Sequence, residues 1–192
     1  PHDIKEYVLC ITDHVSLLEN ERGYDLRQTI NKFSEYMMIL RNKYHIIPIV
    51  VQQQSTETSS LEAFKNNKIR PTTAGLADSK YTSKDCTVML GITNPFVHEL
   101  PEYYSYDITQ FKGNIRFLEV VVNREGESNN IVALYFDGAV NYFRELPPPN
   151  QKTEVQKVIN YINDTIRRRA APVFLLMTNK LKNSFINLYN KF

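Results

Sequence analysis

The stretch Tyr7-Val8-Leu9-Cys10-Ile11-Thr12-Asp13-His14 decides the fold that we expect for this chain. It is an apolar run closed by one carboxylate, and an uninterrupted run of this length is typical of a strand buried on both faces of a parallel sheet. Ligands of open α/β sheets bind at the carboxyl ends of such strands. Asp13 stands at such an end, where a carboxylate either holds Mg²⁺ against a nucleotide or simply caps a turn.

Length and composition restrict the class of protein. With 192 residues, 42% hydrophobic and 23% charged, the chain resembles a soluble globular protein and has room for one α/β domain and an appendage. A net charge of +2 does not require nucleic acid, so any basic surface must be local. Cys10 and Cys86 lie in apolar runs, which favours small buried hydrophobes in a reducing compartment. Because no signal peptide and no apolar run of about 20 residues is present, we expect a cytoplasmic protein without membrane contact.

The elements after the first strand alternate between helix and strand. Asp25 is a suitable N-cap for a helix over Leu26–Tyr44, whose apolar residues recur at three- and four-residue steps. Arg27, Lys32 and Arg41 lie off that apolar stripe, where we expect solvated charges. Residues 56–73 are polar and lack a strong period, which predicts a loop. We expect strands over His45–Val51, Asp85–Ile92 and Ile115–Val122, and a hairpin over Ile131–Phe143 that turns at Asp137-Gly138.

A helical tail follows this α/β part. Pro147-Pro148-Pro149 is a stiff break and the best internal boundary, so we expect a first domain over residues 1–146 and a tail over 147–192. In the tail, the apolar spacing predicts one amphipathic helix that ends at Arg167-Arg168-Arg169 and a second from Val173 to about Tyr189. The alternation of buried strands and helices predicts a parallel or mixed α/β sheet.

Several motifs fall in one order along residues 4–146. A strand ending in Asp13 and a long helix precede a strand ending in Gln53. Arg70-Pro71 and Leu76-Ala77-Asp78-Ser79 follow, and Asn123-Arg124-Glu125-Gly126 precedes the hairpin. This order resembles the second half of the RecA-like motor domain of DnaB-family replicative helicases. The resemblance implies a partial RecA-like P-loop NTPase core without its P-loop strand, with a mixed parallel sheet flanked by helices, a C-terminal β-hairpin and the helical tail.

The resemblance implies roles for three residues. Asp13 is expected to be the Walker B carboxylate that binds the Mg²⁺ of ATP, and Gln53 the polar sensor of the γ-phosphate. Arg124 is expected to be the arginine finger that reaches ATP held by the neighbouring subunit of a ring. The structural alternatives are a turn-capping Asp13, a loop-capping Gln53 and a surface arginine at 124.

The same resemblance places two segments, 56–70 and 76–84, at a central channel that holds single-stranded DNA. Contact with the phosphates of one strand needs basic and small polar groups and no base-reading code. For any one of these lysines, a solvated loop position is the alternative. The expected DNA-binding residues are Lys65, Lys68, Arg70, Ser79, Lys80 and Lys84.

The chain also departs from the family pattern. None of its six glycines begins a Gly-rich loop that ends in Lys-Ser or Lys-Thr. Three explanations remain: a piece of a longer helicase, which we prefer, a helicase split between two chains, and a degenerate non-ATPase. The family's lysine two places before the finger is Val122, and its Arg-Glu pair in the channel loop is Ala77-Asp78. A metal site at Asp13-His14 lacks a partner cluster among the other histidines.

The expected function is therefore the C-terminal part of an ATP-dependent helicase that moves along single-stranded DNA and unwinds duplex. Such a motor is expected to form a ring, most simply a hexamer, and to meet a primase or a helicase loader in a bacterial or phage-infected cell. Without a Walker A motif, this chain alone is expected to be inactive. The alternatives are a non-catalytic remnant of the ATPase fold that binds DNA or a helicase, and one chain of a split RecA- or RadA-like ATPase.

Overall fold

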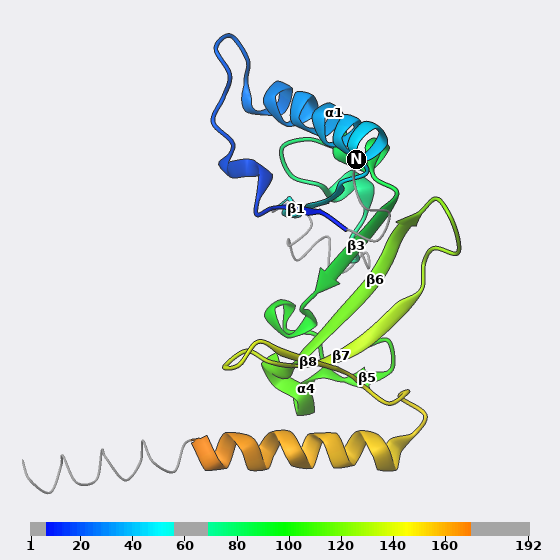
Figure 1. The fold of residues 1–192 in the computed structure, drawn as a ribbon. Helices are drawn as coiled ribbons and strands as arrows, with labels where there is room; N and C mark the ends of the chain where they lie inside the picture. Colours follow the sequence, from blue (N-terminus) through cyan, green and yellow to red (C-terminus); the bar gives the residue numbers. More distant parts are fainter. Residues whose placement is uncertain (1–6, 56–68, 170–192) are drawn as a thin grey trace, which may run out of the picture. The chain divides into compact units, whose positions relative to one another are not determined.

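The computed structural model describes residues 7–55 and 69–169, so Lys65, Lys68 and the expected helix from Val173 lie outside the described part (Figure 1). The chain divides into two compact units. The first contains residues 1–94 and 116–132, and the second contains residues 95–115 and 133–192. Within the described ranges, no helix combines the length and apolar character that a membrane crossing requires.

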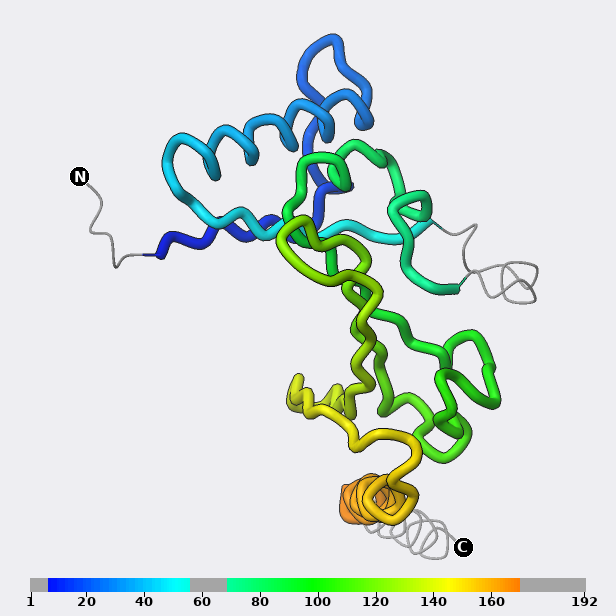
Figure 2. Tube along the Cα trace, turned by 90° about the vertical axis from the view of Figure 1, so that its right-hand side faces the viewer, coloured from blue at the N-terminus to red at the C-terminus, as the bar shows by residue number. Residues whose placement is uncertain are grey.

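A parallel strand pair forms one half of the first unit. Strand β1 (Leu9–Thr12) pairs with β2 (Ile47–Val50), with Leu9 opposite Ile47 and Thr12 opposite Val50. A parallel pair needs a long crossover connection, and helix α1 (Leu26–Tyr44) supplies it after the short 3-10 helix η1 (Val15–Leu17). Figure 2 shows this path, in which α1 leads back from the end of β1 to the start of β2.

The predicted bounds of α1 are confirmed, and a capping box sets where the helix begins. The Asp25 carboxylate accepts the Gln28 N–H at 2.7 Å, and the Gln28 side chain accepts the Asp25 N–H at 2.9 Å. His45 adopts a left-handed conformation with φ of 55° and ends the helix. For this reason β2 begins at Ile47 and not at His45.

The expected burial of β1 on both faces is wrong. Leu9 is 57% exposed and Ile11 is 64% exposed, and their register partners on β2, Ile47 and Ile49, are 41% and 42% exposed. Successive residues of a strand point to opposite faces, so these four side chains share one face. Helix α1 packs against β2, but the described part of the chain leaves this face of the strand pair largely exposed. Cys10 and Cys86 are likewise only half-buried, and both are free thiols.

The second half of the first unit contains β3 (Val88–Thr93), which pairs antiparallel with β6 (Ile115–Asn123). The hydrogen-bonded order of this sheet is β3, β6, β7 (Ile131–Asp137) and β8 (Tyr142–Glu145). The predicted start of β3 at Asp85 is wrong, because residues 82–85 form helix α3 (Thr82–Asp85). The expected single mixed sheet is also wrong for the described strands. The parallel pair of β1 and β2 forms a sheet of its own, separate from the sheet of β3, β6, β7 and β8.

Contacts of α1 hold α3 in the first unit. The Ser34 hydroxyl donates to the Asp85 carboxylate at 2.7 Å, and the Arg41 guanidinium donates to the Asp85 carbonyl at 2.9 Å and to the Thr87 hydroxyl at 3.0 Å. Lys32 forms an ion pair with Glu21. Two of the charges expected to be merely solvated, Lys32 and Arg41, therefore have structural partners.

The second unit joins a Tyr- and Pro-rich segment to the hairpin and the C-terminal helix. Its core includes Ile108, Phe111 and Ile115, each with no exposed surface. The chain is helical over 152–169, and Ile162 of this helix is 1% exposed. Its short elements are η4 (Pro95–His98), β4 (Glu102–Tyr103), β5 (Tyr106–Asp107), α4 (Ile108–Phe111) and η5 (Lys112–Asn114).

The helix over 152–169 is attached to the hairpin by two kinds of contact. The Arg169 guanidinium donates two hydrogen bonds of 2.7 Å to the Asp137 carboxylate, and the rings of Tyr135 and Tyr161 pack edge to face at 6.0 Å. The Tyr106 hydroxyl donates to the Pro147 carbonyl at 2.9 Å and holds the Pro-rich break. The tail up to residue 169 thus packs within this unit.

The hairpin forms, but its predicted turn is too short. Asp137 pairs with Tyr142, so residues 138–141 make the connection and the second strand begins at Tyr142. The Asp137 carboxylate accepts the Ala139 N–H at 3.2 Å, and Asn141 takes a left-handed φ of 49°. These two features favour a four-residue loop over a two-residue turn at Asp137-Gly138.

The exposed apolar strand faces predict that the 192-residue chain on its own is marginally stable and self-associates. We expect its sedimentation to depend on concentration, because Ile11 and Leu90, at 64% and 55% exposure, leave apolar sheet surface in water. Ile11→Lys should reduce the association without loss of helical signal, because the side chain is already mostly in solvent. A sharp, reversible melt of a monomer would contradict this prediction.

The Asp137–Arg169 pair predicts a pH-dependent attachment of the helix over 152–169. The hydrogen bonds from Arg169 hold the pKa of Asp137 below its ordinary value of 3.8. Because the folded-state pKa is the lower one, the stabilisation is fully present above pH 3.8 and is lost as the pH falls through the folded-state value. Asp137→Asn should therefore lower the melting temperature at about pH 7, and its effect should be smaller at about pH 2 than at about pH 7.

A matched control for this pH effect is Lys157→Gln, which removes the exposed pair between Lys157 and Glu154. An exposed pair of this kind contributes little to stability, so its removal should change the melting temperature only slightly at either pH. An Asp137→Asn effect of equal size at both pH values would show that the ion pair is not its cause.

Candidate functional site

Two of the predicted site residues lie at the same edge of the parallel strand pair. Asp13 follows the last residue of β1 and Gln53 follows β2 by three residues, and both are exposed. Backbone bonds continue the pairing beyond the strands, from Val51 N–H to the Thr12 carbonyl at 2.9 Å and from Val15 N–H to the Val51 carbonyl at 3.1 Å. The carboxylate and the amide therefore follow neighbouring strand ends, as the sequence predicts. Their chemical roles stay predictions.

Gln52, which the sequence analysis did not single out, joins β2 to the segment over 76–84. Its amide nitrogen donates to the carbonyls of Ala77 and Ser79, at 2.5 and 2.7 Å, and its amide oxygen accepts the Thr82 hydroxyl at 2.6 Å. The Ala77 N–H also donates to the Gln53 carbonyl at 2.9 Å. Both ends of this segment are thus tied to the carboxyl end of β2.

Two further side-chain bonds complete the frame around this segment. The Ser79 hydroxyl donates to the Asn31 amide oxygen on α1 at 2.6 Å, and Ser79 is 3% exposed. The Ser16 hydroxyl, just after Asp13 in η1, donates to the Asp78 carboxylate at 2.5 Å. The segment is therefore connected to α1 and to the turn after β1 as well as to β2.

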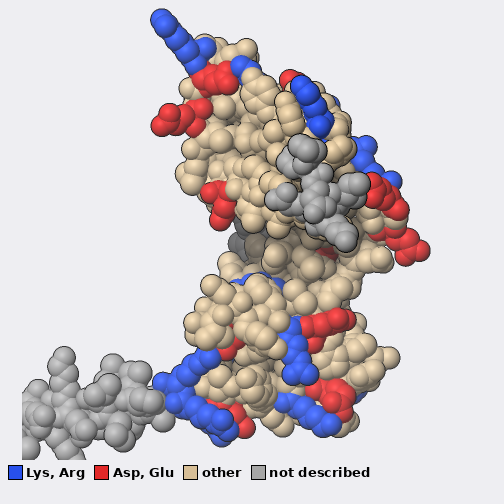
Figure 3. All heavy atoms as spheres, in the orientation of Figure 1, with Lys and Arg blue, Asp and Glu red and all other residues tan. Residues whose placement is uncertain are grey.

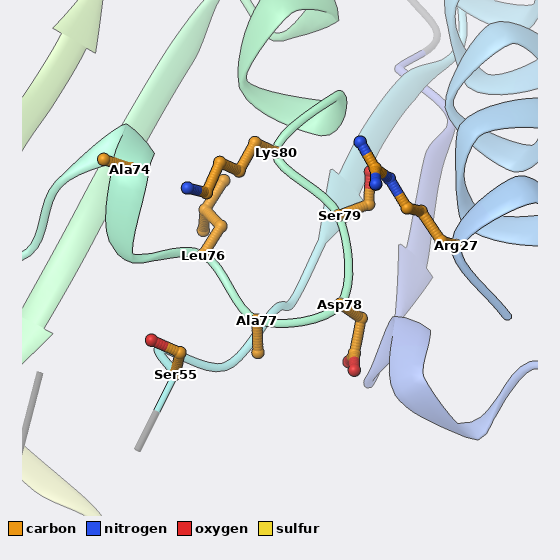
Figure 4. Close-up of a pocket in the computed structure, with 8 residues that line it drawn as sticks. All are labelled: Arg27, Ser55, Ala74, Leu76, Ala77, Asp78, Ser79 and Lys80. Carbon is orange, nitrogen blue, oxygen red and sulfur yellow. The ribbon is translucent and has the colours of Figure 1, made fainter. Parts of the chain in front are cut away.

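A pocket of about 420 Å³ opens between this segment and the start of α1 (Figure 4). A smaller hollow of about 90 Å³ adjoins it and is lined by Arg27, Asn31, Ser79, Lys80, Tyr81 and Lys84. The predicted DNA-binding residues Ser79, Lys80 and Lys84 are thus brought together here. The larger pocket is lined by Arg27, Ser55, Ala74, Leu76, Ala77, Asp78, Ser79 and Lys80.

Arg70, another predicted DNA-binding residue, is engaged within the first unit. Its guanidinium forms an ion pair with Glu119, which lies in the middle of β6 with no exposed surface, and donates to the Asn129 amide oxygen at 3.4 Å. A buried carboxylate is strongly destabilising without a partner. This contact favours an anchoring role for Arg70. Its role thus differs from the DNA-binding role predicted for Ser79, Lys80 and Lys84.

Arg124, the predicted arginine finger, is exposed but tethered. Its guanidinium donates to the Cys86 carbonyl at 2.8 Å and to the Lys84 carbonyl at 2.5 Å. The backbone N–H of Arg124 donates to the Thr87 carbonyl at 3.0 Å. The Asn123 side chain closes the following loop through the Glu125 N–H and the Glu127 carbonyl, both at 3.1 Å. The loop that carries Arg124 therefore contacts the end of the segment over 76–84.

The surroundings of Cys86, beside Arg124, raise the pKa of its thiol. Burial is the main cause that raises the pKa of Cys86, and it outweighs the opposing charge of Arg124. The thiol therefore stays protonated near neutral pH and is a poor nucleophile or metal ligand. Within the ranges that the structure describes, no group of three or more His, Cys, Asp or Glu side chains is arranged to hold a metal, and this includes the surroundings of Asp13 and His14.

The folds of known proteins show which class this architecture defines. The chain is similar to a solved structure of an ATPase domain, with 18% identity and a TM-score of 0.59 over 76% of this chain and 46% of that chain. It is also similar to a structure of a DnaB-like replicative helicase and its interactions with primase, with 17% identity and a TM-score of 0.56 over 71% of this chain and 30% of that one.

These similarities establish that the chain has the fold of DnaB-like helicase ATPase domains, which confirms the expected fold class in its general form. The chain spans less than half the length of either structure. No protein-family model and no curated protein matches the sequence.

The close packing of Pro71 on β3 predicts that a larger residue at Gly91 destabilises the folded protein. A Cβ at Gly91 would overlap the Pro71 ring, next to the Arg70–Glu119 pair. We expect Gly91→Ala to destabilise the folded protein by about 1–3 kcal/mol, the usual cost of overpacking, in denaturant unfolding. Gly113→Ala is the control, because its Cβ would meet only Phe96 at 3.8 Å. Equal free energies of unfolding for the two variants would contradict the prediction.

Proposed function

We propose that this chain is the C-terminal part of an ATP-dependent replicative DNA helicase that moves along single-stranded DNA and unwinds duplex. The observation that supports this most is the DnaB-like ATPase fold, together with Asp13 and Gln53 after neighbouring strand ends. In open α/β folds this edge is where ligands bind. Arg124 on its exposed loop is the proposed arginine finger.

The residues present make part of an ATP·Mg²⁺ site and not a whole one. Asp13 offers one carboxylate for Mg²⁺, and Gln53 an amide for phosphate or water. His14 Nδ1 and Gln54 Oε1, at the same edge, are buried without a hydrogen-bond partner among the described residues, which fits a further polar group there. A phosphate-cradling loop is missing from the sequence, so the remaining contacts must come from residues outside this chain segment or from another chain.

The proposed DNA contact is the segment over 76–84, with Ser79, Lys80 and Lys84. Lys65 and Lys68, in the preceding segment, are assigned to the DNA contact by the resemblance alone. Figure 3 shows basic and acidic side chains interspersed within each unit on the face drawn. The proposed phosphate contact is the local cluster of Lys80 and Lys84 at the pocket. Arg70 is assigned to anchoring because it neutralises Glu119.

The proposed assembly is a ring of identical subunits, most simply a hexamer, in the cytoplasm of a bacterium or of a phage-infected cell. The proposed finger acts on nucleotide held by another subunit, so its assignment requires such an assembly. One structure similar to this chain is of a DnaB-like replicative helicase and its interactions with primase. A primase or a helicase loader is the corresponding proposed partner here.

The absent P-loop supports a second candidate: a remnant ATPase fold that binds DNA or a helicase without catalysis, or one chain of a split RecA- or RadA-like ATPase. The intact mass of the protein from its native source separates these readings. A mass well above 22.4 kDa places further residues in the same polypeptide, where a Gly-Lys-Ser/Thr motif can be sought. A mass of 22.4 kDa requires a partner chain for any ATP hydrolysis.

The finger assignment predicts the behaviour of Arg124→Ala in the native protein. DNA-stimulated ATP hydrolysis should fall by roughly 10³–10⁵-fold, because the guanidinium stabilises transition-state charge, while ATP binding is nearly retained. Arg144→Ala, which removes an exposed arginine of β8, is the matched control and should keep wild-type turnover. Turnover and nucleotide affinity are measured on the same preparations.

A mixing experiment separates a finger from a structural arginine. Arg124 also bonds the Lys84 and Cys86 carbonyls, so its loss could disturb the fold. Mixed rings of Arg124→Ala subunits with subunits mutated in the P-loop should regain part of the activity if the finger acts on the neighbour's ATP. Normal turnover in Arg124→Ala, or no recovery on mixing, would contradict the assignment.

A further inference from the structure

Arg27 lies at the second position of α1 and lines both hollows beside the segment over 76–84. Ser79 and Lys80 also line both, and Lys84 lines the smaller one. In Figure 4 the Arg27 side chain extends from α1 towards Ser79, whereas the Lys80 side chain extends from the segment to the other side, away from Arg27. Basic residues from two elements that are far apart in the sequence thus line the same pocket.

The charges at this pocket are not balanced by acidic side chains. Within residues 7–55 and 69–169, no ion pair engages Arg27, Lys80 or Lys84. Lys84 contacts the Tyr81 ring at 5.5 Å, which leaves its charge uncompensated. Asp78 is the one carboxylate of the lining, and it accepts a hydrogen bond from Ser16. The pocket therefore carries a net positive charge that suits an anion.

Arg27 does not serve the stability of its own helix. Partial positive charge gathers at a helix N-terminus, so a cation in the first turn is unfavourable there. The first turn of α1 holds no acidic residue, and Arg27 is exposed. Arg27 thus opposes the helix dipole next to the Asp25 cap, and no ion pair engages it in the described chain, so a ligand at the pocket accounts for its place better than the stability of the helix does.

The walls of the pocket are held in place before any ligand arrives. Gln52 fixes the carbonyls of Ala77 and Ser79, Asn31 fixes the Ser79 hydroxyl, and that hydroxyl also accepts the Tyr81 N–H at 3.1 Å. Such bonds reduce the conformational entropy that a binding site loses when it is occupied. The cations therefore stand on a rigid frame.

We propose that Arg27, Lys80 and Lys84 form a binding site for a phosphodiester group of single-stranded DNA, which we call the phosphate seat. The planar guanidinium of Arg27 suits two phosphate oxygens at once, and the lysines act as point charges. No aromatic side chain lines the larger pocket, and the one aromatic side chain of the smaller hollow, Tyr81, contacts the Lys84 ammonium at 5.5 Å. Stacking of a base on Tyr81 would not select one base over another, because every base has a flat face. The seat therefore recognises the backbone and not the sequence.

This inference rests on the proposed function, because it requires DNA to run along the segment over 76–84. It adds helix α1 to the DNA contact. The proposed function assigns that contact only to the segment over 76–84 and to the loop before it. A free nucleotide carries the same phosphate chemistry, so the test must separate the two sources. RNA is treated as a further outcome of the test.

The test uses Arg27→Gln in the native protein and fluorescein-labelled oligothymidylate as the probe. At moderate salt we expect the affinity to fall about tenfold, as for the loss of one charge-assisted hydrogen-bonded contact. The slope of log affinity against log salt should decrease by about 0.7, the value for one phosphate contact to a single strand. The melting temperature should be unchanged or slightly higher, because a cation leaves the helix N-terminus.

Lys43→Gln is the matched control, because it removes one positive charge from the last turn of the same helix. It lies about 24 Å along the helix axis from Arg27, since each residue adds about 1.5 Å. We expect its affinity for oligothymidylate and its salt slope to match the wild type. Equal losses in both variants would overturn the seat, because they would reflect only the net charge of the protein.

The remaining outcomes separate the seat from the proposed function. If the wild type binds oligothymidylate and Arg27→Gln binds equally well with the same slope, the seat is wrong and the proposed function stands. If the wild type does not bind the probe at all, both are wrong. A selective loss of a fluorescent ATP analogue would assign the site to a nucleotide, and a loss confined to oligouridylate would assign it to RNA. Either result overturns the proposal.

Discussion

The ion pair that Arg70 forms with the buried Glu119 is the constraint on which the first unit depends. Glu119 sits in the middle of β6 with no exposed surface, and a carboxylate in such a place must be neutralised. Arg70 comes from a distant part of the chain, so satisfying this charge also fixes where the segment before β3 runs. Pro71 follows at once and packs on Gly91, which has no side chain to prevent the approach. The segment after residues 56–68 is thereby fastened to the β3–β6 pair.

A second set of hydrogen bonds connects the parts of the candidate site to one another. Gln52 holds the segment over 76–84 at the end of β2, and Arg124 holds its far end through the Lys84 and Cys86 carbonyls. These bonds connect the strand ends to the basic residues of the pocket and to the loop of the proposed finger. For a motor that couples nucleotide chemistry to movement on DNA, this is the connection that the proposed function needs.

Local patterns predicted the elements well and their surroundings poorly. The helix over Leu26–Tyr44 was predictable because its cap and its periodic stripe are both local. The burial of β1 was not, because it depends on elements that cover the sheet, and one face of this pair is exposed. Asp137-Gly138 indicated a hairpin correctly, but side-chain bonds within the loop set its length. Within the candidate site, the strand-end positions of Asp13 and Gln53 were predictable from the alternation of strand and helix.

The sequence by itself determined the α/β class, the helix α1 and the succession of the main strands along the chain, because hydrophobic periodicity, caps and turn residues act over a few positions. Only the tertiary structure decided that Arg70 neutralises Glu119, that the Gln52 side chain holds the segment over 76–84, and that Arg27 and Lys80 line one pocket. A charged side chain looks the same in the sequence whether it is solvated, paired or aimed at a ligand. The partner that distinguishes these cases is brought to it by the fold, from a distant part of the chain.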